Sequence, residues 1–180
     1  MLMNRDRSVL LIVDVQERLA PSIHEGERVA ANCAWLAGVA HRVGVPVVVT
    51  EHFPEKIGGT VEVVKSATAD ARYVTKQCFS AQADGCLVDT EVDARRQVIV
   101  CGTEAHVCVQ QTALDLRWAG KEVFVVADAA GSRDPANREL AFARMRSHGI
   151  EIVSGEMVAF EWLERGGTEL FRAVNRDFIR

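Results

Sequence analysis

Residues 97–109 have the sequence Gln-Val-Ile-Val-Cys-Gly-Thr-Glu-Ala-His-Val-Cys-Val. The first five residues form an apolar run rich in β-branched side chains, which is typical of a strand covered on both faces. After Gly102 the sequence becomes amphipathic as far as about Ala119, and this predicts a helix. A strand that passes directly into a helix is the building unit of a parallel α/β sheet, and here it places Cys108 in the first turn of the helix.

The same alternation of strand and helix continues along the whole chain. Strands are predicted at Ser8–Asp14, Val45–Thr50, Ala71–Lys76, Gln97–Cys101, Glu122–Ala127 and Ile150–Val153, and helices at about 25–43, 84–94, 106–119, 135–148 and 156–165. Short links between these elements predict right-handed crossovers. We therefore predict a three-layer α/β fold: a mostly parallel, six-stranded Rossmann-like sheet with helices on both faces, formed by a single domain over residues 1–180.

Glycine and proline residues mark the ends of the predicted helices. Gly44, Gly120 and Gly149 each lie between a helix and the following strand, which is the position of a C-cap glycine. Asp134-Pro135 is typical of an N-cap followed by the first helical residue. The one long irregular stretch, about His52–Asp70, is predicted to be a loop that covers a site.

The composition is that of a globular protein, with 48% apolar and 26% charged residues among 180. A formal net charge of -4 argues against nucleic acid or an anionic membrane as a partner, since both attract basic proteins. No apolar run approaches the roughly 18 residues of a membrane span, and the first seven residues lack the pattern of a signal peptide. The five cysteines show no zinc spacing and no CxxC pair, so we expect reduced thiols in a cytoplasmic protein.

Three residues with useful chemistry lie at the carboxyl ends of predicted strands. Asp14 ends the first strand, Lys76 ends the third, and Cys108 follows the fourth. Ligands of open α/β sheets bind outside these strand ends, so we expect the three side chains to share one rim. Backbone N–H groups and the dipole at the start of a helix favour a thiolate, and we therefore expect the pKa of Cys108 to be lowered.

Three segments, in this order, resemble the signature segments of the isochorismatase-like cysteine hydrolases. They are Val13-Asp14-Val15-Gln16, Lys76-Gln77-Cys78-Phe79-Ser80 and the run from Gly102 to Val109. The resemblance extends over essentially the whole chain. It includes Thr50-Glu51 and the tail at residues 154–163, which look like the small branch called isochorismatase domain-containing proteins.

The resemblance implies a catalytic triad of Asp14, Lys76 and Cys108 that transfers an acyl group through a thioester. Asp14 would take the thiol proton and return it to the leaving amine, while Lys76 would hold both groups in register. The backbone N–H groups of Glu104 and Cys108 would form the oxyanion hole, next to a cis peptide bond between Thr103 and Glu104. The expected substrate is a small molecule, an amide or a related acyl compound, and no cofactor is expected.

Three further residues are candidates for binding the substrate. Gln16 follows the first predicted strand and could hydrogen-bond the substrate or the attacking water, while Phe79 and Trp118 are candidates for an apolar wall. No metal site is expected, because Glu51 and His52 cannot supply the three or four converging ligands that zinc needs.

Two other assignments remain open. The chain could be a non-catalytic scaffold or binding protein of the same fold, since related proteins commonly form homo-oligomers and residues 157–163 form an apolar stripe. It could also be a nicotinamidase-type amidase, although the metal pattern after the second strand is lacking. A phospho-receiver and a dinucleotide-binding domain are disfavoured, because the first strand is followed by neither an acidic pair nor GxGxxG. Residues within His52–Asp70 and Ala127–Asp134 are expected to set specificity.

Overall fold

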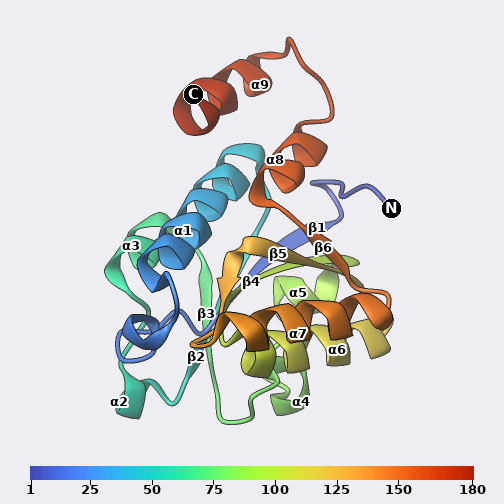
Figure 1. Ribbon diagram of the computed structural model, residues 1–180. Coiled ribbons are helices and arrows are strands. Elements are labelled where there is room, and N and C mark those ends of the chain that lie inside the picture. Colours follow the sequence, from blue (N-terminus) through green and yellow to red (C-terminus); the bar gives the residue numbers. More distant parts are fainter.

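The structure, a computed structural model, describes residues 1–180 and is built around one sheet of six parallel strands (Figure 1). The strands are β1 (Ser8–Val13), β2 (Val47–His52), β3 (Arg72–Lys76), β4 (Gln97–Thr103), β5 (Glu122–Gly131) and β6 (Glu151–Val153). Their spatial order is β3-β2-β1-β4-β5-β6. The chain therefore winds outward in two directions from β1 and β4, and such a switch point is where open α/β sheets place their ligands. The predicted fold class is confirmed.

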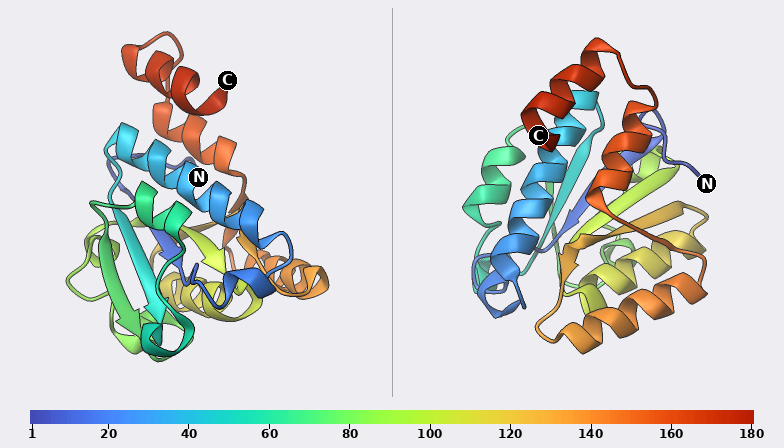
Figure 2. Two further views of the ribbon diagram at one scale, coloured as in Figure 1. Left: turned by 90° about the vertical axis from the view of Figure 1, so that its left-hand side faces the viewer. Right: turned by 45° about the horizontal axis from the view of Figure 1, so that its top comes forward.

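Helices cover both faces of the sheet (Figures 1 and 2). One face carries α1 (Gly26–Val43), α3 (Glu62–Ala67) and α8 (Gly155–Leu163), and the other carries α4 (Ala81–Asp84), α5 (Glu91–Ala94), α6 (Gln110–Trp118) and α7 (Pro135–Ser147). The remaining helical pieces are α2 (Pro54–Ile57), α9 (Glu169–Val174), a 3₁₀ turn at Ala20–Ser22 and π-turns at Ala105–Val109 and Asn175–Ile179. None of the helices has both the length and the apolar composition needed to cross a membrane.

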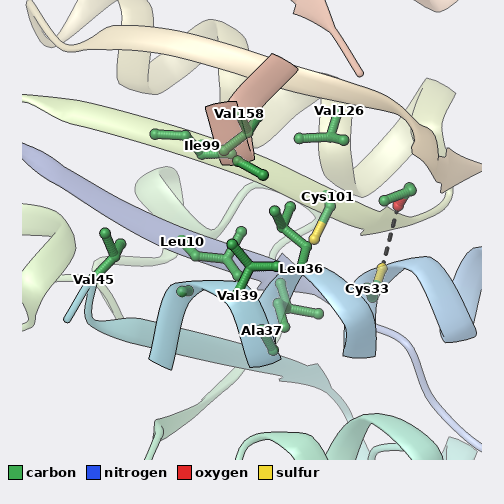
Figure 3. Packing of buried hydrophobic residues seen from close by; sticks show 14 of the residues in the cluster. Leu10, Cys33, Leu36, Ala37, Val39, Val45, Ile99, Cys101, Val126 and Val158 are labelled. Carbon is green, nitrogen blue, oxygen red and sulfur yellow. Dashed lines mark hydrogen bonds between the residues drawn. The ribbon is translucent and has the colours of Figure 1, made fainter. Parts of the chain in front are cut away.

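Each face of the sheet has its own hydrophobic core. Leu10 and Ile12 of β1 point into the core under α1 and α8, which Figure 3 shows from close by. Leu11 and Val13 point into the core under α6 and α7. Every residue of β1 is buried, because side chains alternate between the two faces and both faces are covered. This packing fixes the ends of the central strands, where the functional side chains lie.

The predicted helix ends are confirmed by backbone geometry. Gly44 adopts the left-handed conformation at φ +79°, and Gly120 and Gly149 follow the same pattern at +90° and +76°. At the start of α7 the Asp134 carboxylate accepts the N–H of Ala136 at 2.8 Å. These local signals lie in the sequence itself and need no tertiary contact.

Three expectations about longer segments are wrong. The helix expected at about 84–94 is two short helices, because Gly85 ends α4 at φ +82° and Thr90 caps α5 by accepting the N–H of Val92. The stretch His52–Asp70 is not a free loop over the site, since it contains α2 and α3 and its second half packs on α1. Strand β5 also continues to Gly131, so most of the predicted loop after it is strand.

The last helical segment was not anticipated and lies against α1 (Figure 2). Its Phe171 ring lies 6.4 Å, centroid to centroid, from the Phe160 ring of α8. The indole Nε1 of Trp35 on α1 donates a hydrogen bond to the carbonyl oxygen of Phe178 at 2.7 Å. Gly38, also on α1, leaves room for the Phe178 ring, since a Cβ atom there would lie 2.6 Å from it. This segment extends the core under α1 and α8 and lies on the sheet face opposite to α6.

Candidate active site

Asp14 directly follows β1 and is held by the two neighbouring strands. Its backbone is left-handed, with φ +52°, and none of its surface is exposed. Thr50 of β2 donates its hydroxyl to Asp14 Oδ1 at 2.6 Å. Thr103 at the end of β4 donates its hydroxyl to the Asp14 backbone oxygen at 2.5 Å. Both the main chain and the carboxylate of Asp14 are therefore fixed in orientation.

Lys76 ends β3 and reaches past β2 to Asp14. Its ammonium nitrogen lies 2.6 Å from Asp14 Oδ2, and both side chains are 0% exposed. The same nitrogen donates to the backbone oxygen of Cys78 at 3.2 Å. A buried ion pair is tolerated only where geometry and further hydrogen bonds offset the loss of water, and both are present here.

The loop after β3 is anchored at both of its ends. Asp84 on α4 accepts the backbone N–H groups of Cys78 and Gln77, each at 2.8 Å, and these hydrogen bonds lower the pKa of Asp84. Further along, the Ser80 hydroxyl donates to Asp115 Oδ2 of α6 at 2.6 Å. The Cys78 carbonyl oxygen, which accepts a hydrogen bond from the Lys76 ammonium, therefore lies in a loop that is anchored to α6.

Cys108 lies in the π-turn Ala105–Val109 between β4 and α6 and is 4% exposed. Burial and the neighbouring Asp14 carboxylate raise the pKa of Cys108 to about 12, against the lowering effect of the Lys76 ammonium. The expectation of a lowered pKa is therefore wrong. The thiol is not in the first turn of a regular helix, and burial beside a carboxylate outweighs the N–H groups of the turn. At neutral pH the thiol is protonated and lies beside the ion pair.

The turn that brings Cys108 to this edge contains no cis peptide bond. The bond between Thr103 and Glu104 is trans, contrary to the expectation from the resemblance. The chain turns instead through two unusual residues, Gly102 at φ +123° and Glu104 at φ +24°. Only glycine reaches the first of these values easily.

The side chain of Glu104 forms the centre of a second polar cluster at the same edge. Its Oε1 accepts the Arg133 Nε–H at 2.5 Å, and the carboxylate is only 8% exposed. Its Oε2 lies 3.4 Å from His106 Nδ1 and has no hydrogen-bond partner. The His106 Nδ1 is 2.9 Å from the Ser132 hydroxyl. Glu104 and His106 follow β4, and Ser132 and Arg133 follow β5, which pairs with it.

Aromatic rings border the lysine side of the site. The rings of His52 and Phe79 have centroids 5.5 Å apart, and Phe53 lies 4.8 Å from His52. Burial and the nearby Lys76 ammonium lower the pKa of His52, so its imidazole is neutral at neutral pH. Phe79 is 51% exposed and remains a candidate for an apolar wall. A cavity of about 430 Å³ adjoins this side and is lined by Phe53 and Lys76 among others.

Residues 8–157 match the family described as the Isochorismatase domain. The chain belongs to this family. It is 33% identical over 174 residues to isochorismatase domain-containing protein 2A of Mus musculus. The aligned residues cover 95% of this chain and 82% of the relative. Family membership supports a hydrolase.

Two solved structures of this fold are similar over most of both chains. A Caenorhabditis elegans protein described as MAR1 ribonuclease has a TM-score of 0.92 at 30% identity, over 100% of this chain and 93% of its own. The YcaC gene product of Escherichia coli, described as an octameric hydrolase of unknown specificity, has a TM-score of 0.86 at 25% identity, over 92% of this chain and 83% of its own.

Within this isochorismatase-family fold, two of the predicted substrate-binding residues do not reach the site. Gln16 is completely buried, and its amide donates to the backbone oxygens of His52 at 3.0 Å and Gly58 at 2.7 Å. These hydrogen bonds hold the backbone between His52 and Gly58, and they leave the Gln16 amide without a group that is free to bind a ligand. Trp118 is 69% exposed at the last residue of α6, ten residues after Cys108, which is about 15 Å along a helix.

The residues considered as metal ligands have other partners. Glu51 Oε1 accepts the backbone N–H of Thr60 at 2.7 Å and its hydroxyl at 2.8 Å. No three His, Cys, Asp or Glu side chains converge into a group that could hold a metal ion. All five cysteines are free thiols.

The sequence did not show how several residues support the site. Thr50 and Thr103 hold Asp14, Asp84 holds the loop after β3, and Arg133 contacts Glu104. Thr103 ends β4, Arg133 follows the end of β5 by two residues, and Thr50 lies in the second half of β2, so a position near the end of a strand was a usable signal. Their partners were not visible, because those contacts connect residues 29 to 89 positions apart.

Proposed function

We propose that this protein is a cysteine hydrolase that cleaves a small amide or a related acyl compound through a thioester on Cys108, without a metal ion. The observation that carries this proposal is the buried Asp14–Lys76 contact beside a neutral thiol. A thiol with a raised pKa attacks a carbonyl carbon only when a neighbouring group takes its proton. Asp14, held in place by three strands, is the base for that step.

In the first half of the reaction the amide carbonyl carbon approaches the Cys108 sulfur. Asp14 takes the thiol proton, a C–S bond forms, and the carbonyl oxygen becomes an oxyanion that backbone N–H groups of Glu104 and Cys108 stabilise. The positive charge of Lys76 stabilises the negative charge that develops on the sulfur while the Asp14 carboxylate takes the proton. The C–N bond then breaks, the proton passes from Asp14 to the amine, and a thioester is left.

In the second half a water molecule attacks the thioester. Asp14 takes a proton from the water as the new C–O bond forms, and the same carboxyl returns a proton to the sulfur as the C–S bond breaks. The net reaction converts the amide and water into a carboxylic acid and an amine. Each step uses the same acid–base group, which agrees with its complete burial and fixed orientation.

A non-catalytic scaffold of the same fold is the second candidate, and one observation favours it. A cysteine that is 4% exposed, with a pKa of about 12, also has the properties of an inert buried thiol. Against this candidate, burying Asp14 and Lys76 beside an inert thiol offers no gain, because an apolar pair is often at least as stable. The ion pair therefore favours catalysis.

We further propose that the protein forms homo-oligomers in the cytoplasm. Its relative YcaC is described as octameric, and large apolar side chains such as Trp118, Leu140 and Met157 are exposed on this chain. Free cysteines fit a reducing compartment. Light scattering at micromolar concentration tests the assembly, and a monomeric mass would contradict it.

Ammonia release from a panel of small amides, ureido acids and nicotinamide analogues tests the activity. We expect Cys108→Ala to lower kcat by about 10⁴-fold or more, because it removes the nucleophile. Cys86→Ala is the matched control, since it removes a half-buried thiol that the mechanism does not use. Turnover that survives in Cys108→Ala, with the same substrate, would exclude the thioester route.

A further inference from the structure

A groove between α1 and α3 has a mainly apolar lining. The two helices pack side by side on one face of the sheet (Figures 1 and 2). The groove is a cavity of about 580 Å³, and its lining includes Ala30 and Ala31 of α1 together with Val61 and Val63 at the start of α3. Val63 is 49% exposed although its side chain is apolar. A cavity of this size and polarity accepts a large apolar side chain or a small molecule.

Two carboxylates without partners also line this groove. Glu17 and Glu27 are both exposed, and neither side chain takes part in an ion pair or a hydrogen bond. The nearby Glu25 differs, because it is paired with Arg28 at 3.1 Å. An apolar groove with two unpaired negative charges is complementary to an apolar group that has positive charges beside it.

The chain carries a surface of this composition at the end of α6. Trp118 is 69% exposed, and its ring lies 6.4 Å, centroid to centroid, from the ring of His148. His148 Nδ1 is 2.9 Å from the backbone oxygen of Arg144. Arg117 precedes the tryptophan, and neither guanidinium group has an ion-pair or hydrogen-bond partner. We call these four residues the tryptophan face. Exposed tryptophan and arginine side chains are enriched at the centres of protein interfaces.

The groove and the tryptophan face of one chain cannot meet each other. α1 and α3 cover one face of the sheet, and α6 covers the opposite face. The groove also lies near the carboxyl edge of the sheet, since Glu17 follows Asp14 by three residues, whereas Trp118 ends a helix that runs from the end of β4 toward the start of β5. A contact between the two surfaces therefore joins two copies and is heterologous.

Other occupants leave part of this surface unexplained. A small apolar amine would fill the groove, but the tryptophan face would remain uncovered. Pairing of two tryptophan faces would bring Arg117 and Arg144 of one copy toward the same cations of the other, and like charges oppose such a contact. The heterologous contact gives each unpaired charge an opposite one.

We propose that Trp118 of one copy inserts into the groove between α1 and α3 of a second copy. The two unpaired guanidinium groups beside the indole then face the two unpaired carboxylates of the groove. Each copy has one tryptophan face and one groove, so repetition of the contact gives a ring if the rotation between copies closes. This inference rests on the proposed homo-oligomer and is independent of the thioester chemistry.

Two variants each remove one half of the contact. Trp118→Ala lacks the inserted side chain, and Ala31→Arg places a long cation in the groove at an exposed position of α1. We expect each variant to raise the dissociation constant of the oligomer by about 30-fold or more, as for an interface hot spot. Phe160→Ala removes an exposed aromatic ring on α8, and Ala69→Arg adds the same cation outside the groove. Both controls are expected to assemble like the wild type.

A mixture of the two variants distinguishes the heterologous contact from the alternatives. Light scattering is expected to give the single-chain mass of 19.8 kDa for each variant alone and twice that mass for a 1:1 mixture, because one tryptophan and one groove remain intact. Ala31→Arg that assembles by itself, while Trp118→Ala does not, would show that tryptophan faces pair with each other and would overturn the proposal.

The remaining outcomes also decide the question. A mixture that stays monomeric would show that the two residues do not meet, and an oligomer that neither substitution weakens would overturn this contact alone. A monomeric wild type at high micromolar concentration would overturn both the contact and the proposed homo-oligomer, and it would leave the proposed hydrolase untouched.

Discussion

At the scale of single residues, the ionisation of Cys108 decides the order of events. Burial and the Asp14 carboxylate raise its pKa to about 12, so the free protein holds a thiol and not a thiolate. The proton must leave during the attack and not before it. Asp14 therefore has two opposing effects on the sulfur: it suppresses the thiolate at rest and removes the proton when a substrate is present.

These opposing effects predict that Asp14→Asn separates reactivity from turnover. Removing the charge and the acceptor lowers the pKa of Cys108 while the Lys76 ammonium remains. We expect hydrolysis to be lost and alkylation of Cys108 by iodoacetamide at pH 8 to become about 3- to 10-fold faster. Lys76→Met is expected to slow alkylation, since it removes the charge that favours the thiolate. Slower alkylation of Asp14→Asn than of the wild type would contradict this account.

At the scale of elements, the conformation of the chain at the ends of β3 and β4 depends on backbone contacts. Gly102 at φ +123° lies so close to β1 that a Cβ atom would be 2.1 Å from the Val13 backbone oxygen. The loop after β3 depends on the Asp84 carboxylate, which accepts two backbone N–H groups there. Neither residue touches the thiol in the proposed mechanism, yet both set where the triad residues lie.

Gly102→Ala is expected to destabilise the fold by about 3 kcal/mol or more, because the new methyl group meets a backbone that cannot move aside. The urea midpoint of unfolding measures the effect. Gly120→Ala is the matched control, since glycine is also left-handed there but a Cβ atom would meet nothing within 4 Å. Equal losses of stability in the two variants would show that conformation, and not the approach of β1, sets the cost.

Asp84→Asn is expected to lower kcat by about tenfold and to leave KM nearly unchanged. A neutral amide oxygen holds the N–H groups of Gln77 and Cys78 less firmly, so the carbonyl that receives the Lys76 ammonium becomes less well placed. Asp93→Asn on α5 makes the same chemical change at an exposed site and is expected to retain full activity. A change in KM alone would contradict a positioning role.

At the scale of the whole molecule, the sheet hides ionisable thiols in its two cores. Burial raises the pKa of Cys86 to about 11 and that of Cys108 to about 12, and the pKa of Cys101 lies well above its ordinary value through its hydrogen bond with Cys33 and burial. Folding therefore favours the protonated thiols. Their contribution to stability is complete below about pH 9, where unfolded cysteines are protonated, and is lost as the pH rises toward the folded values.

This linkage predicts that alkaline pH destabilises the wild type more than Cys108→Ser. Between pH 8 and pH 10.5 the difference in unfolding free energy between the two proteins is expected to change by about 2 kcal/mol, since serine does not titrate. Urea unfolding at both pH values measures it, and the comparison cancels the titration of lysine and tyrosine. A constant difference would show that the thiol ionises in the folded protein as it does in the unfolded chain.

Much of the fold could be predicted because its signals are local. The apolar runs that become β1, β4 and β5, the glycines after α1 and α6, and the Asp134 cap each lie within a few residues of the feature that they determine. The prediction of a helix at 84–94 is wrong because Gly85 adopts a left-handed conformation and ends α4 there. The spacing of hydrophobic residues continues past Gly85 and did not indicate this end.

The candidate site was predictable only in part, for the same reason. Its three central residues lie at strand ends, and parallel strands bring their carboxyl ends to one edge whatever the separation along the chain. The wrong assignments concerned side-chain environment. Gln16 was expected to face the ligand, but its amide is used by the backbone of Gly58, and Trp118 lies at the far end of α6.

The sequence by itself determined the α/β class, the family and the strand ends at which Asp14, Lys76 and Cys108 lie, because periodicity and motif order are written along the chain. Only the tertiary structure decided that the thiol is protonated, that the Lys76 ammonium is paired with Asp14, and that Arg133 contacts Glu104. Ionisation and hydrogen bonding depend on distance and burial, and both arise only when segments far apart in the chain pack together.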